Sequence, residues 1–167
     1  MTRFPSPLKA LLVVLFVLMA SGPAQATWYW THGHSGHVED LTGVTSVVPT
    51  GTGLKIDLAF DGSAWVHYAL PTIGESTQGA RYLKIRFCIE NALNSWISDV
   101  YVYNGDILVK KFPVVLGSAG CQTTTFDLGQ VRSFPRSLGV SIKINSGPDS
   151  GIDEFLIVGV GANFVAK

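Results

Sequence analysis

The chain has 167 residues, of which 12 are Lys or Arg and 12 are Asp or Glu, so its formal net charge at pH 7 is zero. This length suits one domain with a substantial buried core. A nucleic-acid partner is excluded, because binding to phosphates needs a concentrated basic face and the longest basic run is the pair Lys110-Lys111.

The first 26 residues have the three parts of an export signal. Arg3 and Lys9 supply positive charge, residues 10–20 are apolar throughout, and residues 24–26 (Ala-Gln-Ala) form a small-x-small cleavage site. An apolar run of this length makes about 16 Å of helix, which is too short to cross a hydrocarbon core of about 30 Å. We therefore predict a cleaved signal peptide at residues 1–26 and a secreted or periplasmic protein with no membrane span after cleavage.

Residues 27–167 then form the mature protein, a single domain of 141 residues whose net charge is −2, because cleavage removes two basic residues and no acidic ones. Apolar residues alternate with polar or small ones at residues 54–60, 64–70 and 138–144, which is typical of strands with one face on a core. Further strands are predicted at residues 79–90, 96–103, 106–112, 122–128 and 152–164.

Short turn signals separate these strands. Asp61-Gly62 predicts a tight hairpin between two of them, and Asn104-Gly105 predicts another hairpin with a type I′ turn. No stretch of ten residues shows the 3.6-residue period of a helix. About eight to ten short strands at this spacing predict an all-β fold, an antiparallel β-sandwich of the jelly-roll type.

The two cysteines, Cys88 and Cys121, both lie in the mature part. An even number of cysteines in an exported chain predicts one disulfide. Alternation within residues 82–90 places Cys88 on the polar face of its strand, where a lone cysteine is unusual and a bridging one fits. A catalytic thiol would need a histidine base, and no histidine is near either cysteine in sequence.

Five segments in a fixed order resemble a group of small, mostly uncharacterised microbial single-domain proteins with jelly-roll β-sandwich folds. The segments are Trp30-Thr31-His32-Gly33 with Val38-Glu39, then residues 62–72 (GSAWVHYALPT), 97–105 (ISDVYVYNG), 137–144 (SLGVSIKI) and 158–164 (VGVGANF). The resemblance covers nearly all of the mature chain. It implies the sandwich fold and carries over no catalytic residue, because no such residues are assigned in that group.

Three of the four histidines, His32, His34 and His37, lie within six residues, next to Glu39 and Asp40. In an extended strand His32 and His34 project from the same face, and a bend could bring His37 round to them. Three imidazoles suit Zn or Cu, so the cluster is a candidate metal site. The alternative is a polar segment near the new N-terminus that binds nothing.

A second candidate metal site is the acidic cluster of Asp149, Asp153 and Glu154 near the C-terminus. Carboxylates on a loop of this kind suit Ca²⁺, which takes oxygen ligands, although the spacing does not match an EF-hand. The alternative is a solvated turn that precedes the last strand.

Aromatic residues on the predicted strands form a third candidate site. Tyr101 and Tyr103 share a face of strand 96–103 with Asp99, whereas strict alternation puts Trp96 on the opposite, core face. Trp65 lies on another strand. A face that mixes aromatic and polar groups suits stacking on sugar rings or a partner surface, and we predict binding by Trp65, Tyr101 and Tyr103. Simple cross-strand pairing is the alternative.

Motifs of known catalytic centres are absent from the sequence: there is no Gly-x-Ser-x-Gly elbow, His-Glu-x-x-His, phosphate loop or dinucleotide fingerprint. His67 could act as a lone base, although packing or surface exposure explains it as well. No catalytic residue is assigned. The leading hypothesis is an exported non-catalytic binding module for carbohydrate or cell-envelope glycan. The alternatives are a small metal-dependent enzyme centred on the three clustered histidines and a structural surface protein, and the sequence does not define the oligomeric state.

Overall fold

The computed structural model describes residues 26–72, 77–90, 94–148 and 153–167, so the predicted signal peptide up to Gln25 lies outside the described residues. The described chain forms eleven β-strands and one short 3-10 turn, Gly33–Ser35. The strands are β1 (Thr27–His32), β2 (His37–Val38), β3 (Val44–Pro49), β4 (Leu54–Leu58), β5 (Ser63–Leu70), β6 (Gln78–Ile89), β7 (Ser95–Asn104), β8 (Ile107–Leu116), β9 (Gly120–Arg132), β10 (Leu138–Ser146) and β11 (Asp153–Ala166). In these ranges no helix has the length and apolar character that crossing a membrane requires.

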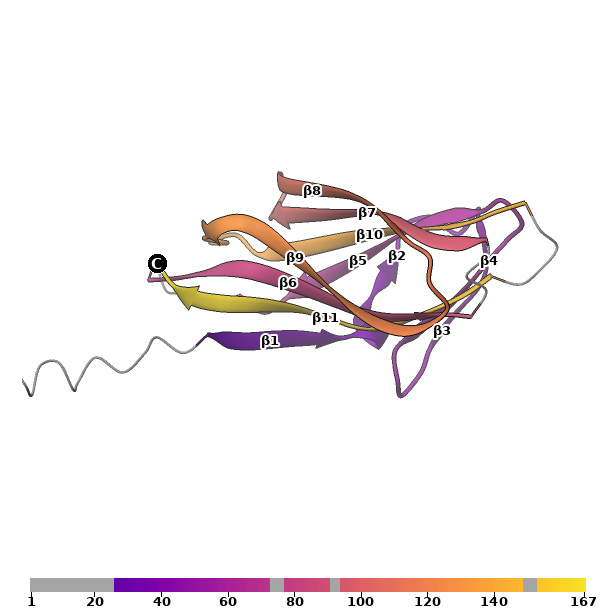
Figure 1. Ribbon diagram of the computed structural model, residues 1–167, viewed down its shortest axis with the longest axis horizontal. Coiled ribbons are helices and arrows are strands. Elements are labelled where there is room, and N and C mark those ends of the chain that lie inside the picture. Colours follow the sequence, from indigo (N-terminus) through magenta and orange to yellow (C-terminus); the bar gives the residue numbers. More distant parts are fainter. Residues whose placement is uncertain (1–25, 73–76, 91–93, 149–152) are drawn as a thin grey trace, which may run out of the picture.

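The strands build two antiparallel sheets that lie face to face (Figure 1). One sheet has the order β3-β4-β11-β6-β9, and β1 pairs with the C-terminal half of β11. The other sheet has the order β2-β5-β10-β7-β8. The quartets β4-β11-β6-β9 and β5-β10-β7-β8 have the strand order of a jelly roll, two interlocking Greek keys in which the chain passes from one sheet to the other. The predicted fold class is confirmed.

The core fills the space between the sheets. It consists of the alternate residues of each strand that point inward. On β4, Leu54, Ile56 and Leu58 are at most 2% exposed, whereas the residues between them are half-buried. The inner faces of β6, β10 and β11 are built in the same way. Each aliphatic side chain buried in this manner contributes roughly 1.5–3 kcal/mol. Every strand predicted from alternation is present, with ends moved by a few residues.

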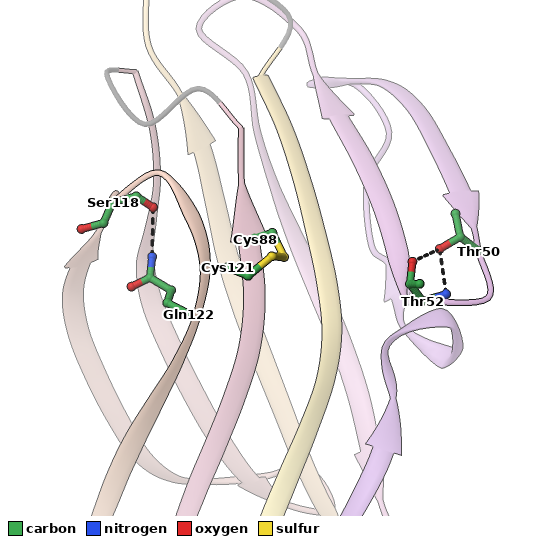
Figure 2. The surroundings of a disulfide bond; sticks show 6 residues. All are labelled: Thr50, Thr52, Cys88, Ser118, Cys121 and Gln122. Carbon is green, nitrogen blue, oxygen red and sulfur yellow. Dashed lines mark hydrogen bonds between the residues drawn. A yellow bond between two sulfur atoms is a disulfide. The ribbon is translucent and has the colours of Figure 1, made fainter.

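The predicted disulfide between Cys88 and Cys121 is present, with an S–S distance of 1.99 Å (Figure 2). The two residues lie directly opposite each other on β6 and β9, with a Cα–Cα distance of 3.9 Å. Both side chains are on the outer face of the sheet, because Phe87 and Ile89 on either side of Cys88 point into the core. The bridge therefore ties together two neighbouring strands outside the core.

The Asp61-Gly62 turn is not the predicted hairpin. It connects β4 to β5, which lie in different sheets, so this turn is a corner between the layers. Asp61 has a φ of 51°, and the Gly62 amide donates to the Ala59 carbonyl at 2.9 Å. Phe60, predicted as part of the strand, lies beyond its end and is 64% exposed. The same residue pair suits either connection, and the choice depends on sheet pairing far along the chain.

The second predicted hairpin, between β7 and β8, is present but its loop lies one residue later. Asn104 pairs with Ile107, so the two loop residues are Gly105 and Asp106. A type I′ turn needs positive φ at both loop residues. Among the described residues that are not glycine only Asp61 has positive φ, and Gly105 has a φ of 63°. The loop therefore fits type II′, which requires glycine at its first position.

Candidate functional site

The predicted binding residues Trp65, Tyr101 and Tyr103 lie on one face, the outer face of the β2-β5-β10-β7-β8 sheet. On β5, Trp65 alternates with buried residues, and on β7 the two tyrosines do the same. Register fixes their neighbours: Trp65 is opposite Lys143 on β10, and Tyr101 is opposite Ser141. The sheet therefore brings together residues that are about 40 positions apart in the sequence.

A bulge in β7 corrects one part of the sequence prediction. Strict alternation put Trp96 with the core and Ile97 on the face of the tyrosines. In the structure Ile97 is fully buried and Trp96 is half-buried, because Ser98 is an extra residue in β7: Ile97 is opposite Ile144 of β10, whereas Asp99 is opposite the adjacent Lys143. The extra residue reverses the phase of the alternation before Asp99 and leaves it unchanged after, so Tyr101 and Tyr103 stay where the pattern placed them.

Two aromatic rings converge over the middle strand of this face. The ring centroids of Trp65 and Tyr101 are 4.8 Å apart, with an interplanar angle of 50°. These residues come from β5 and β7, which are separated by β10 and hence by about 9.6 Å at the backbone. The side chains therefore lean towards each other. Lys143 Nζ lies 5.9 Å from the Trp65 ring centroid, and Lys111 Nζ lies 4.7 Å from that of Tyr101.

Beside these two rings, the part of β10 that forms the bottom of a groove of about 530 Å³ carries only small side chains. Ser141 and Gly139 of β10 supply the floor. A Cβ added at Gly139 would have one neighbour within contact range, the Tyr103 Cβ at 3.5 Å, so the space above this glycine is open. The groove is lined by Glu39, Trp65, His67, Tyr68, Tyr101, Tyr103, Gly105, Asp106, Gly139, Val140 and Ser141.

A chain of hydrogen bonds runs along one side of the groove. His67 Nδ1 lies 2.7 Å from Ser141 Oγ, and His67 Nε2 lies 3.2 Å from Glu39 Oε2. In the tautomer that donates from Nε2 to the carboxylate, Nδ1 is an acceptor for the Ser141 hydroxyl. The backbone also holds Glu39, whose amide donates to the Trp65 carbonyl at 3.0 Å.

Sequence reasoning missed this chain of hydrogen bonds. His67 was assigned to packing or the surface, and neither Glu39 nor Ser141 was proposed for this site. Only the register of β5 with β2 and β10 brings these residues together, across separations of 28 and 74 residues. No local motif predicts such a contact.

The serine, histidine and glutamate types match those of a hydrolase triad, but the surroundings do not. An acyl-transfer site needs preorganised hydrogen-bond donors directed at the developing oxyanion, and backbone N–H groups commonly supply them. Ser141 is in the middle of β10, which pairs with β5 on one side and β7 on the other. The backbone N–H groups around it therefore belong to the two ladders. The arrangement fits hydrogen bonding to a bound molecule better than it fits nucleophilic attack.

The three clustered histidines do not converge. His32 Nδ1 and His34 Nδ1 are 2.7 Å apart, but His37 lies on β2, opposite His67 of β5. Within the described ranges no group of three His, Cys, Asp or Glu side chains is arranged to hold a metal ion. The 3-10 turn between His32 and His37 separates them, an outcome that the sequence prediction of a single bend did not include.

The acidic cluster near the C-terminus is also divided. Asp149 lies outside the described residues. Asp153 is 1% exposed and accepts a hydrogen bond from Ser95 Oγ at 2.7 Å, whereas Glu154 forms an ion pair with Lys55. Adjacent strand residues point to opposite faces, so the carboxylates of Asp153 and Glu154 do not face the same side of β11.

Comparisons with known proteins place the fold but no family. No family model matches the chain, and no curated protein sequence matches it significantly. The xylan-binding module CBM15 aligns with a TM-score of 0.51 and 12% identity, over 85% of this chain and 97% of that one. A cyclase from Fischerella sp. TAU (TM-score 0.48, 14% identity, 83% and 90% of the chains) and the C-terminal CBM6 of LamC, a marine laminarinase from Zobellia galactanivorans (0.46, 12%, 83% and 99%), are also similar. At these identities the similarity shows the sandwich fold alone.

Proposed function

We propose that this chain is an exported, non-catalytic module that binds carbohydrate in the groove beside Trp65 and Tyr101. The convergence of these two rings over a low polar floor is the observation that carries the proposal. A pyranose has an apolar C–H face and a rim of hydroxyl groups. It therefore suits a site in which aromatic rings lie beside fixed hydrogen-bonding groups.

The polar groups of the groove suit the hydroxyl rim. Glu39 and Asp106 are exposed and present carboxylate oxygens, which accept hydrogen bonds. His67 is held by its two hydrogen bonds, so its position is fixed before a ligand binds. Preorganised groups cost less conformational entropy on binding. Tyr103 lies about 6.8 Å along β7 from Tyr101 and extends the aromatic wall, so the groove suits an oligosaccharide rather than one sugar unit.

Xylan is the first ligand class to test, because the similar CBM15 structure is a xylan-binding module. Export is proposed from the N-terminal signal of positive, apolar and small-x-small segments. The disulfide is compatible with an extracellular or periplasmic location, since oxidising compartments preserve such bonds.

A glycan array with residues 27–167, followed by calorimetry on the glycans retained, tests the proposal. Tyr101→Ala removes one of the two converging rings while the backbone of β7 remains paired on both sides. We expect about a tenfold loss of affinity, which corresponds to about 1.4 kcal/mol. Tyr82→Ala is the matched control, because this tyrosine is 37% exposed on β6, in the other sheet. Equal losses in the two variants, or no retention of any glycan class, would contradict the proposal.

A further inference from the structure

The outer face of the other sheet carries a second arrangement of aromatic and polar groups, away from the groove. Three neighbouring strands form its rows. On one row Trp30 of β1 is opposite Gly161 of β11, which is opposite Lys84 of β6. On the next row His32, Gly159 and Arg86 are opposite one another in the same way. The glycines of β11 therefore lie between a row of ring side chains on β1 and a row of cations on β6, here called the cationic wall.

The two glycines allow Trp30 to lie flat against the sheet. A Cβ added at Gly161 would lie 2.6 Å from the Trp30 ring, so only glycine leaves room for the indole there. A Cβ added at Gly159 would lie 3.2 Å from the Thr31 carbonyl oxygen and 3.6 Å from the Trp30 ring, both of β1, with no other atom within 4 Å, so the space above this residue is filled only on the side of β1. A hollow of about 380 Å³ opens at this point, lined by Trp30, Thr31, His32, Arg86, Val158 and Gly159.

The indole surface here is large and accessible. Trp30 is 46% exposed, and it stacks on Trp28 with ring centroids 5.9 Å apart and an interplanar angle of 28°. Trp28 is further held by Lys84, whose Nζ lies 4.4 Å from the ring centroid. A stacked pair braced in this way presents a preformed apolar plate to a ligand.

Among the described residues, neither cation of this wall, Lys84 or Arg86, forms an ion pair with a carboxylate. Within the described chain, no hydrogen bond or ion pair involves the guanidinium of Arg86, which is exposed. Asp127 of β9 forms its ion pair with Arg81 instead. The residues opposite Lys84 and Arg86 on β9 are Thr125 and Thr123, which are uncharged. The hollow therefore has a free planar guanidinium on one side and an indole on the other.

We propose that this hollow is a second binding site, and that its ligand is an acidic sugar unit, a pyranose with a carboxylate. The pyranose ring stacks on Trp30, and the carboxylate receives two parallel N–H donors from Arg86, the geometry that a guanidinium offers to a carboxylate. The site lies on the opposite sheet from the groove, so it does not depend on the function proposed for Trp65 and Tyr101.

Titration of residues 27–167 with trigalacturonate and with its methyl ester tests the proposal. The ester retains the pyranose rings and removes the charge. Binding is followed by the four tryptophan indole N–H signals in ¹⁵N NMR spectra, with the Trp30 signal assigned from Trp30→Phe. We expect saturable movement of the Trp30 signal with the acid and at least about tenfold weaker binding of the ester. Raising NaCl from about 20 mM to about 150 mM should weaken binding of the acid only.

Arg86→Gln is the decisive variant, since an exposed side chain without a partner is removed with little effect on folding. It should weaken binding of the acid by about tenfold, and Arg86→Lys should restore part of the loss, because an ammonium supplies charge without the planar fork. Tyr101→Ala should bind trigalacturonate as the unmodified protein does, which separates this site from the groove. Equal binding of acid and ester, an unchanged Arg86→Gln, or a Trp30 signal that does not move would each overturn the proposal.

Discussion

Replacement of both cysteines by serine measures what the Cys88–Cys121 bridge contributes to stability. The bridge closes a loop with a sequence separation of 33. The chain-entropy relation gives a loss of about 3.8 kcal/mol at 25 °C for a loop of this length. Cys121 is exposed and Cys88 is half-buried on the outer face of the sheet, so the serines leave little cavity in the core. Nearly all of the expected loss therefore comes from greater freedom of the unfolded chain.

Urea unfolding followed by tryptophan fluorescence gives the free energy of unfolding of both proteins. Thermal unfolding provides an independent measure. At about 2.1 cal/mol/K per residue, a domain of 141 residues has an unfolding entropy of about 0.3 kcal/mol/K, so Tm should fall by about 13 °C. The unmodified protein in reductant should show the same loss as the double variant. A loss below about 1 kcal/mol would refute the loop-closure reasoning.

Three further outcomes follow from the described contacts. Ser95→Ala removes the hydrogen-bond donor to buried Asp153 and should lower the free energy of unfolding by about 1–3 kcal/mol, as measured in urea; an unchanged value would mean that this carboxylate has another donor. Burial raises the pKa of the Tyr68 hydroxyl, so as the pH rises the unfolded chain loses the hydroxyl proton before the folded protein does. The free energy of unfolding should therefore fall above about pH 10, by up to about 1.4 kcal/mol per pH unit. Tyr68→Phe should show a smaller fall with pH, and an equal fall would contradict the role given to Tyr68. EDTA should leave glycan affinity and Tm unchanged, because the groove proposal requires no metal; loss of either on chelation would contradict it.

Strand positions could be predicted because burial on one face of a sheet imposes a period of two. Residues 64–70 and 138–144 show this clearly, and both are central strands whose inner faces fill the core. β1 was not predicted because its exposure pattern is set by aromatic rings lying on the outer face of the sheet, which alternation of hydrophobicity does not identify. β2 has only two residues, and β3 is partly exposed with no regular alternation of buried and exposed residues, so neither strand shows a period of two.

Connections were predicted less well than strands, because a turn sequence specifies local backbone angles and not the sheet to which the next strand belongs. Asp61-Gly62 illustrates this, since its angles suit a corner between sheets as well as a hairpin. The bulge at Ser98 is similar. It places Trp96 on the face opposite to the predicted one, and only the pairing of β7 with β10 reveals it.

The candidate groove was predicted in part. Trp65, Tyr101 and Tyr103 were chosen for their residue types and alternation, and the sheet brings them to one face. Glu39, His67 and Ser141 complete the groove through hydrogen bonds between strands that are neighbours in the sheet but far apart in the sequence. Residue spacing does not predict this register. The histidine cluster is the opposite case: His32 and His37 are close in the sequence, but the turn at residues 33–35 separates them.

The central claim, that the groove beside Trp65 and Tyr101 binds carbohydrate, is tested most directly by mapping a bound oligosaccharide. Backbone and indole NMR signals of residues 27–167 are recorded during titration with xylohexaose and with the glycan that an array retains best. The account predicts saturable shifts confined to residues 65–67, 101–106 and 139–141, together with the Trp65 indole. Shifts clustered elsewhere on the sandwich, or none with either ligand, would contradict it.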